Sequence, residues 1–255
     1  MRINEGDFVL LLSQEGNTYL VKIKDGYFST HKDTIYLGSL KGLNWGDKIV
    51  TKKGNIFYLI KPTIYDFIMK VDRLTQIIYP KDIGFILLKL NVGPGKIVLE
   101  CGGGSGALTS AFAFVVGDSG KVISYEKEAK FQEIAKKNIA RLGISHRVIF
   151  KLKEVKTEFE EKEVDAVFLD IKEPWMLLKA SWESLKYGSP LGILVPTTNQ
   201  ISECLKEMKK LPFVGIEVVE ILLRKYKTNP DRIRPEDRMV AHTGYLIFAK
   251  KVKDI

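Results

Sequence analysis

The chain has 255 residues, enough to bury a sizeable core in one or two domains. Its 40 Lys and Arg residues outnumber 31 Asp and Glu residues, and the resulting formal charge of +9 favours polyanionic partners such as nucleic acid or an anionic membrane. The sequence has no apolar run that could cross a bilayer, no signal-peptide pattern, and only two cysteines without metal-ligand spacing, so we expect a cytoplasmic protein without a metal site.

Residues 1–62 are predicted to form a small β-barrel-like domain. Short β-type runs alternate there with turn sequences such as Asp25-Gly26 and Gly54-Asn55, and this regular spacing is typical of a barrel or a meander. The periodicity changes at Thr63, where helical stretches at residues 63–70 and 80–90 begin. We therefore place a second domain at residues 63–255.

The second domain alternates β-type and helical runs. The β-type runs lie at residues 97–100, 121–125, 148–150, 166–169 and 191–195, and the helical runs at 107–115, 127–142, 175–187 and 199–210. This alternation predicts an α/β fold with a parallel sheet and helices on both faces. The last two β-type runs, 216–226 and 245–250, have no helix between them, which predicts an antiparallel pair at the end of the sheet.

A glycine-rich segment, "VLECGGGSGALT" at residues 98–109, follows the first β-type run of this domain. Gly102, Gly104 and Gly106 leave the backbone bare between a strand and a helix, where a nucleotide-like ligand can approach the chain closely. Gly102, Gly104 and Ala107 also fit the dinucleotide fingerprint. A tight turn without a ligand is the alternative.

Three acidic residues narrow the choice of ligand for this segment. Glu126 ends the next β-type run, where an acid can accept from both ribose hydroxyls, although NAD enzymes use an acid there too. Glu100 favours a cationic ligand such as S-adenosylmethionine over a pyrophosphate, or else is a solvated or loop-capping carboxylate. Glu154, with Val155 beside it, can accept from an adenine amino group, or is a surface residue of a mixed charge run.

Asp170 is the leading catalytic candidate. It follows the β-type run 166–169, at the sheet edge where α/β proteins bind ligands, and the alternative is a helix N-cap. Methyl transfer from a sulfonium is an in-line displacement, and methylation of an adenine ring nitrogen makes the ring cationic. A carboxylate beside the exocyclic amine would stabilise that charge and take up a proton.

Five segments together resemble the tRNA (adenine-N1)-methyltransferases, which modify adenine 58 of the T-loop and in some archaeal members also adenine 57. These segments are 76–82 (QIIYPKD), 98–109, 124–126 (SYE), Asp170 with Pro174-Trp175, and 234–245 (RPEDRMVAHTGY). The resemblance covers essentially the whole chain. It implies a class I S-adenosylmethionine-dependent methyltransferase with a seven-stranded Rossmann-like sheet, an antiparallel last strand, a small N-terminal β-domain, tRNA as substrate and a homotetramer.

The resemblance also implies roles for individual residues. Asp170 would be the catalytic carboxylate, and Tyr79 would lie beside the target base, where an aromatic ring can stack on an extruded purine. Ordinary core packing is the alternative for Tyr79. The predicted S-adenosylmethionine contacts are Glu100, Gly102, Gly104, Ser105, Gly106, Ala107, Leu108, Glu126, Glu154, Val155 and Asp170. Gly103 departs from the family, where Thr is common at this position.

Other functions remain open at this stage. They are a methyltransferase for an isoaspartyl protein or a small molecule, a non-catalytic tRNA-binding partner subunit, and an NAD-dependent oxidoreductase. The abundance of Lys, Glu and Ile and the scarcity of Gln are typical of heat-adapted proteins, so we also expect a thermophilic protein.

Overall fold

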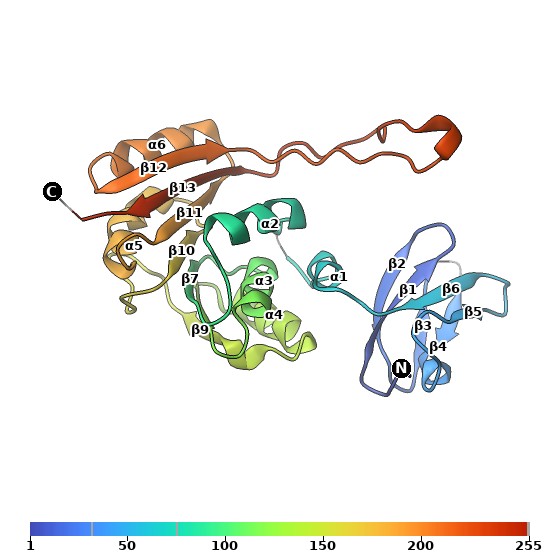
Figure 1. The fold of residues 1–255 in the computed structure, drawn as a ribbon. Helices are drawn as coiled ribbons and strands as arrows, with labels where there is room; N and C mark the ends of the chain where they lie inside the picture. The colour runs from blue at the N-terminus through green and yellow to red at the C-terminus, as the bar shows by residue number, and fades with distance from the viewer. Residues whose placement is uncertain (32, 75, 254–255) are drawn as a thin grey trace. The chain divides into compact units, whose positions relative to one another are not determined.

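The computed structural model describes residues 1–31, 33–74 and 76–253, which group into two compact units, Met1–Lys70 and Val71–Ile255. Figure 1 traces the chain and labels its elements. Among the described residues, no helix has the length and apolar character needed to cross a membrane.

The first unit is the predicted small β-domain. Its four-stranded antiparallel sheet has the order β2 (Thr18–Lys22), β1 (Phe8–Ser13), β6 (Ile56–Ile60), β5 (Lys48–Val50). A separate hairpin of β3 (Tyr27–Ser29) and β4 (Thr34–Tyr36) was not predicted from the sequence. Apolar side chains that alternate along the strands, Val9 and Leu11 among them, form the core of this unit.

The short helix α1 (Ile64–Met69) groups with the first unit, although the sequence pattern placed it in the second domain. The ring of Phe67 packs edge-on against Phe8, with 5.5 Å between the centroids. Lys70 donates from Nζ to the carbonyl oxygen of Thr18 at 2.8 Å. These contacts explain why the boundary between the two compact units falls after Lys70.

The second unit contains a seven-stranded sheet that confirms the predicted topology. Its order is β12 (Phe213–Val219), β13 (Tyr245–Lys251), β11 (Pro190–Val195), β10 (Ala166–Leu169), β7 (Ile97–Cys101), β8 (Lys121–Glu126), β9 (Val148–Leu152). The strands from β11 to β9 run parallel, whereas β13 is antiparallel to both of its neighbours. Every residue of β10 is buried, as expected for a central parallel strand that is covered on both faces.

Helices cover both faces of this sheet (Figure 1). On one face lie α2 (Pro80–Lys89), α3 (Ala107–Val116) and α4 (Ala129–Arg141). On the other lie α5 (Leu178–Ser184), which a 3-10 turn at Pro174–Leu177 precedes, and α6 (Thr198–Met208). The helix predicted at 175–187 is therefore shorter than expected, because Leu185 turns to an extended conformation and bridges to Val164.

Residues 220–244, which we call the arm, leave the sheet between β12 and β13 (Figure 1). The β-type run predicted at 216–226 is wrong at its end, since β12 stops at Val219. Val219 pairs with Leu246 near the start of β13, so the next residues have no partner strand. The arm doubles back on itself instead, through a bridge between Tyr226 and Pro235.

Candidate active site

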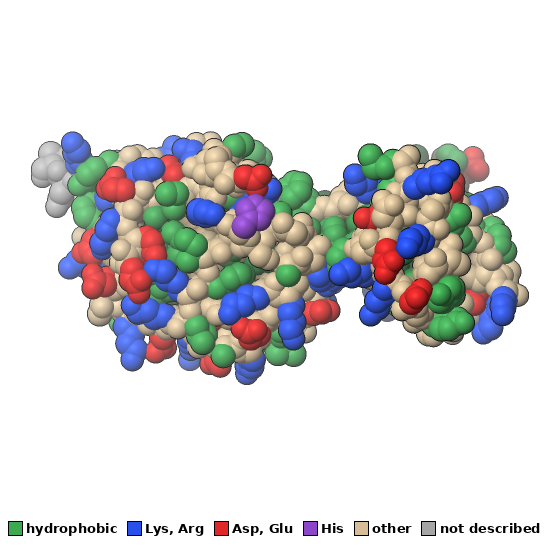
Figure 2. Space-filling model, turned by 90° about the horizontal axis from the view of Figure 1, so that it is seen from below, with side chains coloured by type: hydrophobic (Ala, Val, Ile, Leu, Met, Phe, Trp, Pro, Cys, Tyr) green, Lys and Arg blue, Asp and Glu red, His purple; other side chains and the backbone are tan. Residues whose placement is uncertain are grey.

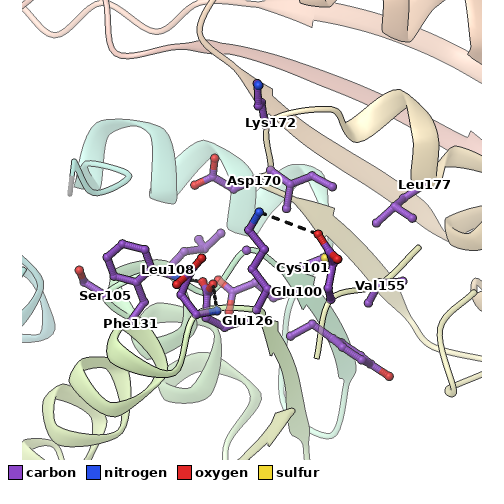
Figure 3. Close-up of a pocket in the computed structure, with 18 of the residues that line it drawn as sticks. Glu100, Cys101, Ser105, Leu108, Glu126, Phe131, Val155, Asp170, Lys172 and Leu177 are labelled. Atoms are coloured by element: carbon purple, nitrogen blue, oxygen red, sulfur yellow. Dashed lines mark hydrogen bonds and ion pairs between the residues drawn. The ribbon is translucent and has the colours of Figure 1, made fainter. Parts of the chain in front are cut away.

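A pocket of about 640 Å³ opens in the second unit at the carboxyl ends of β7, β8 and β10 (Figure 3). Its volume lies within the usual range for small-molecule sites. Most of the predicted site residues line this pocket, namely Glu100, Gly102, Gly104, Ser105, Ala107, Leu108, Glu126, Glu154, Val155 and Asp170. Gly106 and Tyr79 lie outside its lining.

The glycines of the loop at residues 102–106 serve three different purposes. A Cβ on Gly102, which has a φ of 95°, would overlap the carbonyl oxygen of Asp170, so this glycine permits β7 and β10 to end side by side. A Cβ on Gly104, with a φ of 51°, would meet nothing within 4 Å, which leaves the pocket open beside the backbone. A Cβ on Gly106 would lie 2.9 Å from the Cβ of Ala135, so this glycine allows α4 to pack tightly on the loop.

Glu126, at the end of β8, is bonded to the backbone of the loop. Its Oε2 accepts from the Gly104 amide at 2.9 Å, and its Oε1 accepts from the Glu128 amide at 3.0 Å. These two bonds fix the orientation of a carboxylate that lines the pocket. The arrangement suits an acceptor for hydroxyl groups of a nucleoside.

Glu100 lies beneath the loop, where its side chain is 1% exposed. One carboxylate oxygen accepts from Ser124 Oγ at 2.8 Å and from Thr109 Oγ1 at 2.5 Å. Burial raises the pKa of this carboxyl to about 7, against the opposing effect of the two hydroxyl donors. The solvated alternative is therefore wrong, since the carboxyl is buried and its hydroxyl partners lie on α3 and β8, and Glu100 also lines the pocket.

Asp170 stands half-buried just beyond β10, and its amide donates to the carbonyl oxygen of Cys101 at 2.8 Å. Burial, assisted by the negative charge of Glu126, raises the pKa of its carboxyl to about 7. The N-cap alternative fails, because the following 3-10 turn is capped at Glu173. Asp170 therefore lines the pocket without capping the following turn, and the pKa of its carboxyl lies near neutral pH.

Tyr79 caps the start of α2 next to the pocket lining. Its hydroxyl donates to Gln76 Oε1 at 3.2 Å and accepts from Arg73 Nη1 at 3.4 Å. The residues just before it, Gln76, Ile77 and Ile78, line the pocket. A place for Tyr79 beside a target base stays a prediction.

The sequence analysis missed several lining residues. Phe131 lies near the start of α4, and Lys172 and Leu177 follow Asp170 on the loop and turn after β10 (Figure 3). The position of Phe131, on the helix that directly follows Glu126, is the one signal in the sequence that could have indicated it.

Glu154, a predicted residue of the pocket lining, is exposed and pairs with Lys156 at 3.6 Å and Lys127 at 3.9 Å.

Two of the five segments that carry the resemblance, 76–82 and 234–245, meet in space beside the pocket-lining residues. The buried Lys81 donates from Nζ to Thr243 Oγ1 at 2.6 Å, to the carbonyl oxygen of Ile221 at 2.7 Å and to Asp82 Oδ1 at 2.9 Å. Thr243 Oγ1 in turn donates to Asp82 Oδ2 at 2.8 Å. Both ends of the arm, at Ile221 and Thr243, are thus held to the start of α2.

The donor and acceptor groups of the pocket fit a nucleoside that carries positive charge. Glu126, Asp170 and Glu100 supply acidic groups, and the open face of Gly104 gives backbone access. Ser105 Oγ is buried with no hydrogen-bond partner among the described residues, which leaves a polar group beside the pocket for a ligand. Within residues 1–31, 33–74 and 76–253, no three His, Cys, Asp or Glu side chains gather to hold a metal ion.

Comparison with known proteins finds similarity to tRNA methyltransferases. Residues 55–238 match the family model described as tRNA methyltransferase complex GCD14 subunit. The chain is 30% identical to the tRNA (adenine(57)-N(1)/adenine(58)-N(1))-methyltransferase TrmI of Methanocaldococcus jannaschii, over 95% of this chain and 94% of that protein.

Two solved structures extend this similarity to the whole chain. The tRNA (m1A58) methyltransferase TrmI of Aquifex aeolicus is 38% identical with a TM-score of 0.88, and the match covers 100% of both chains. A SAM-dependent O-methyltransferase of Thermotoga maritima is 43% identical with a TM-score of 0.94, over 99% of this chain and 96% of the other.

Proposed function

The chain belongs to the GCD14 family of tRNA methyltransferases, and we propose on this premise that it transfers a methyl group from S-adenosylmethionine to N1 of adenine 58 in the T-loop of tRNA. The observation that carries the proposal is the meeting of the glycine loop, Glu126 and Asp170 in one pocket at the carboxyl edge of the sheet. This is the edge where α/β proteins bind their ligands.

Each residue has a defined part in this function. When bound, S-adenosylmethionine supplies an electrophilic methyl group on a positively charged sulfur. Glu126 holds the ribose hydroxyls, and Gly104 lets the nucleoside lie against bare backbone. Asp170 accepts a hydrogen bond from the exocyclic amine of adenine, stabilises the positive charge that the ring gains on methylation, and takes up the proton that is later lost.

Finer properties form part of the same proposal. Adenine 57 is a second target, in keeping with the name of the Methanocaldococcus jannaschii relative. The protein is a cytoplasmic, heat-adapted homotetramer that binds RNA, and its charge of +9 supports binding to a polyanion. Figure 2 shows Lys and Arg interspersed with Asp and Glu over the face that it draws, so charge on that face does not mark a tRNA surface.

The test is methylation of unmodified tRNA transcripts with methyl-labelled S-adenosylmethionine, followed by nuclease digestion and mass spectrometry. We expect 1-methyladenosine at positions 58 and 57. Replacing A58 by G should remove the methyl group at position 58, and replacing either adenine alone should halve the total 1-methyladenosine if both positions are used equally. Label confined to protein or to free metabolites would overturn the proposal.

The 43% identical structure from Thermotoga maritima supports a second candidate, since its description is that of an O-methyltransferase. A hydroxyl acceptor must lose its proton during transfer, and Asp170, with a carboxyl pKa raised to about 7, is suited to act as that base. Transfer of label to a hydroxylated small molecule or to a ribose hydroxyl, with tRNA adenine left unmodified, would favour this candidate.

A further inference from the structure

The rim segment, which the structure describes at residues 72–74 and 76–79, has no regular secondary structure at these residues and borders the pocket. It contributes Gln76, Ile77 and Ile78 to the lining and ends at Tyr79, where α2 begins. A segment without a hydrogen-bonded ladder opens more easily than a strand or helix, so its placement depends on a small number of anchors.

Asn138, on the inner face of α4, is such an anchor. Its side chain is 3% exposed, and its amide pairs with both backbone groups of one residue of the rim segment. Asn138 Nδ2 donates to the carbonyl oxygen of Asp72 at 2.8 Å, and Oδ1 accepts from the Asp72 amide at 3.0 Å. The buried amide thus makes the pair of backbone hydrogen bonds that a neighbouring strand would make in a sheet.

The same amide also holds the glycine loop. Nδ2 donates its second hydrogen to the carbonyl oxygen of Ser105 at 2.9 Å, and Oδ1 also accepts from Arg141 Nη1 at 3.4 Å. A primary amide has two donors and two acceptor sites, and all four are therefore used. Asn138 joins the loop on one side of the pocket to the rim segment on the other.

We infer that Asn138 is a positioning residue that couples occupancy of the cofactor side of the pocket to ordering of the rim segment that receives the target base. This rests on the proposed function. A ligand that fixes the loop at Gly104 and Ser105 fixes the carbonyl to which Asn138 donates. The Asn138 amide, and with it the backbone of Asp72, then becomes less mobile, so the rim segment is ordered before tRNA binds. Cofactor and tRNA should accordingly strengthen each other's binding.

Hydrogen exchange with S-adenosylhomocysteine as the probe tests this coupling without requiring turnover. In the wild-type chain we expect the ligand to slow exchange in residues 98–109 and also, by about threefold or more, in residues 71–79. In Asn138→Ala and in the isosteric Asn138→Asp, which places an oxygen opposite two carbonyls, protection should stay in the loop and be lost from the rim segment.

Gln132→Ala provides the matched control. Gln132 is also a buried residue of α4, six residues before Asn138, but its Nε2 bonds to nothing among the described residues. This variant should keep protection in both segments. In the wild type, S-adenosylhomocysteine should also tighten tRNA binding about fivefold or more, and this factor should approach one in Asn138→Asp.

Three outcomes are distinguishable. Failure of S-adenosylhomocysteine to bind the wild-type chain would overturn the proposed function and this inference together. Binding with protection of residues 98–109 but none of residues 71–79 would overturn the inference alone, whether or not the Asn138 variants fold. Equal loss of coupling in Gln132→Ala would likewise show that general packing of α4, and not Asn138, carries the effect.

Discussion

The glycine loop and the rim segment face the same pocket but are built in different ways. The loop is placed by its own backbone and by neighbouring strands, since Gly102 touches Asp170, and Gly104 bonds to Glu126. The rim segment is placed by side chains from distant elements, with Asn138 at one end and the cluster of Lys81, Asp82 and Thr243 at the other. The proposed cofactor side is thus placed mainly by the adjoining strands of the sheet, whereas the proposed substrate side depends on side chains from elements outside the sheet.

The largest expected effect comes from Asp170, the group that both sides of the pocket share. Asp170→Asn should lower kcat by about 10²- to 10⁴-fold, the range typical for loss of a general acid or base. The Kd for S-adenosylhomocysteine, which lacks the sulfonium charge, should change little. Glu203→Gln, which removes an exposed carboxylate on α6, is the control. A kcat within threefold of wild type for Asp170→Asn would remove Asp170 from the chemistry.

Substitutions in the glycine loop distinguish a glycine that the fold requires for steric reasons from a glycine that leaves space for a ligand. Gly102→Ala should lower the free energy of unfolding by about 2–5 kcal/mol, because a Cβ at a φ of 95° is strained and overlaps a carbonyl oxygen. Gly104→Ala should lower the free energy of unfolding by only about 1–2 kcal/mol. It should nevertheless weaken S-adenosylmethionine binding, because the added methyl group fills part of the pocket. Thermal melts and calorimetric titration measure both effects.

Gly143→Ala serves as the control for these two substitutions. Gly143 has a φ of 71° and, like Gly104, has open space at its Cβ position, but it lies after α4 and outside the pocket. Gly143→Ala should lower the free energy of unfolding through backbone strain without weakening S-adenosylmethionine binding. Similar affinities for Gly104→Ala and Gly143→Ala would mean that the ligand does not lie against Gly104.

Thr243→Val tests the far end of the substrate side. The substitution keeps the size of the side chain but removes its bonds to Lys81 and Asp82, at a cost of about 1–2 kcal/mol in stability. We expect a higher KM for tRNA with an unchanged Kd for S-adenosylhomocysteine. Thr228→Val, at an exposed position on the arm, should leave both values unchanged. A weaker cofactor Kd in Thr243→Val would contradict the separation of the two sides.

A pH dependence tests the two acids of the proposed cofactor side whose pKa values are raised by burial. Asp170 and Glu100 both have a carboxyl pKa raised to about 7 from ordinary values of 3.8 and 4.5, so between those limits the folded chain holds more protons than the unfolded chain. The free energy of unfolding should therefore fall as pH rises from about 4 to 7. S-adenosylmethionine affinity should rise from pH 6 to 8, by up to about tenfold per unit below the pKa, because the ionised acids attract a cation.

S-adenosylhomocysteine, whose thioether sulfur carries no charge, provides the comparison for this pH dependence. Its affinity should vary less over the same range, and calorimetry in buffers of different ionisation enthalpy should detect proton release with the cationic ligand only. Equal pH profiles for the two ligands would show that neither Asp170 nor Glu100 senses the sulfonium charge.

Much of the cofactor side could be predicted from the sequence. Parallel strands end at one edge of a sheet, so the residues after each strand, here the glycines, Glu126 and Asp170, must converge once the alternating pattern is recognised. The same pattern predicted the antiparallel last strand. Phe131 escaped prediction because an aromatic residue near the start of a helix is more often part of the core.

The amino-acid sequence by itself determined the order of strands and helices, the bare loop and the acids at the strand ends, since each depends on neighbours within a few residues. Only the tertiary structure decided that α1 packs on the first unit, that β12 stops where its partner strand begins, and that Lys81 meets Thr243. It also placed Asn138 between Asp72 and Ser105. These features depend on side-chain contacts between residues distant in the chain, and local periodicity carries no information about such pairs.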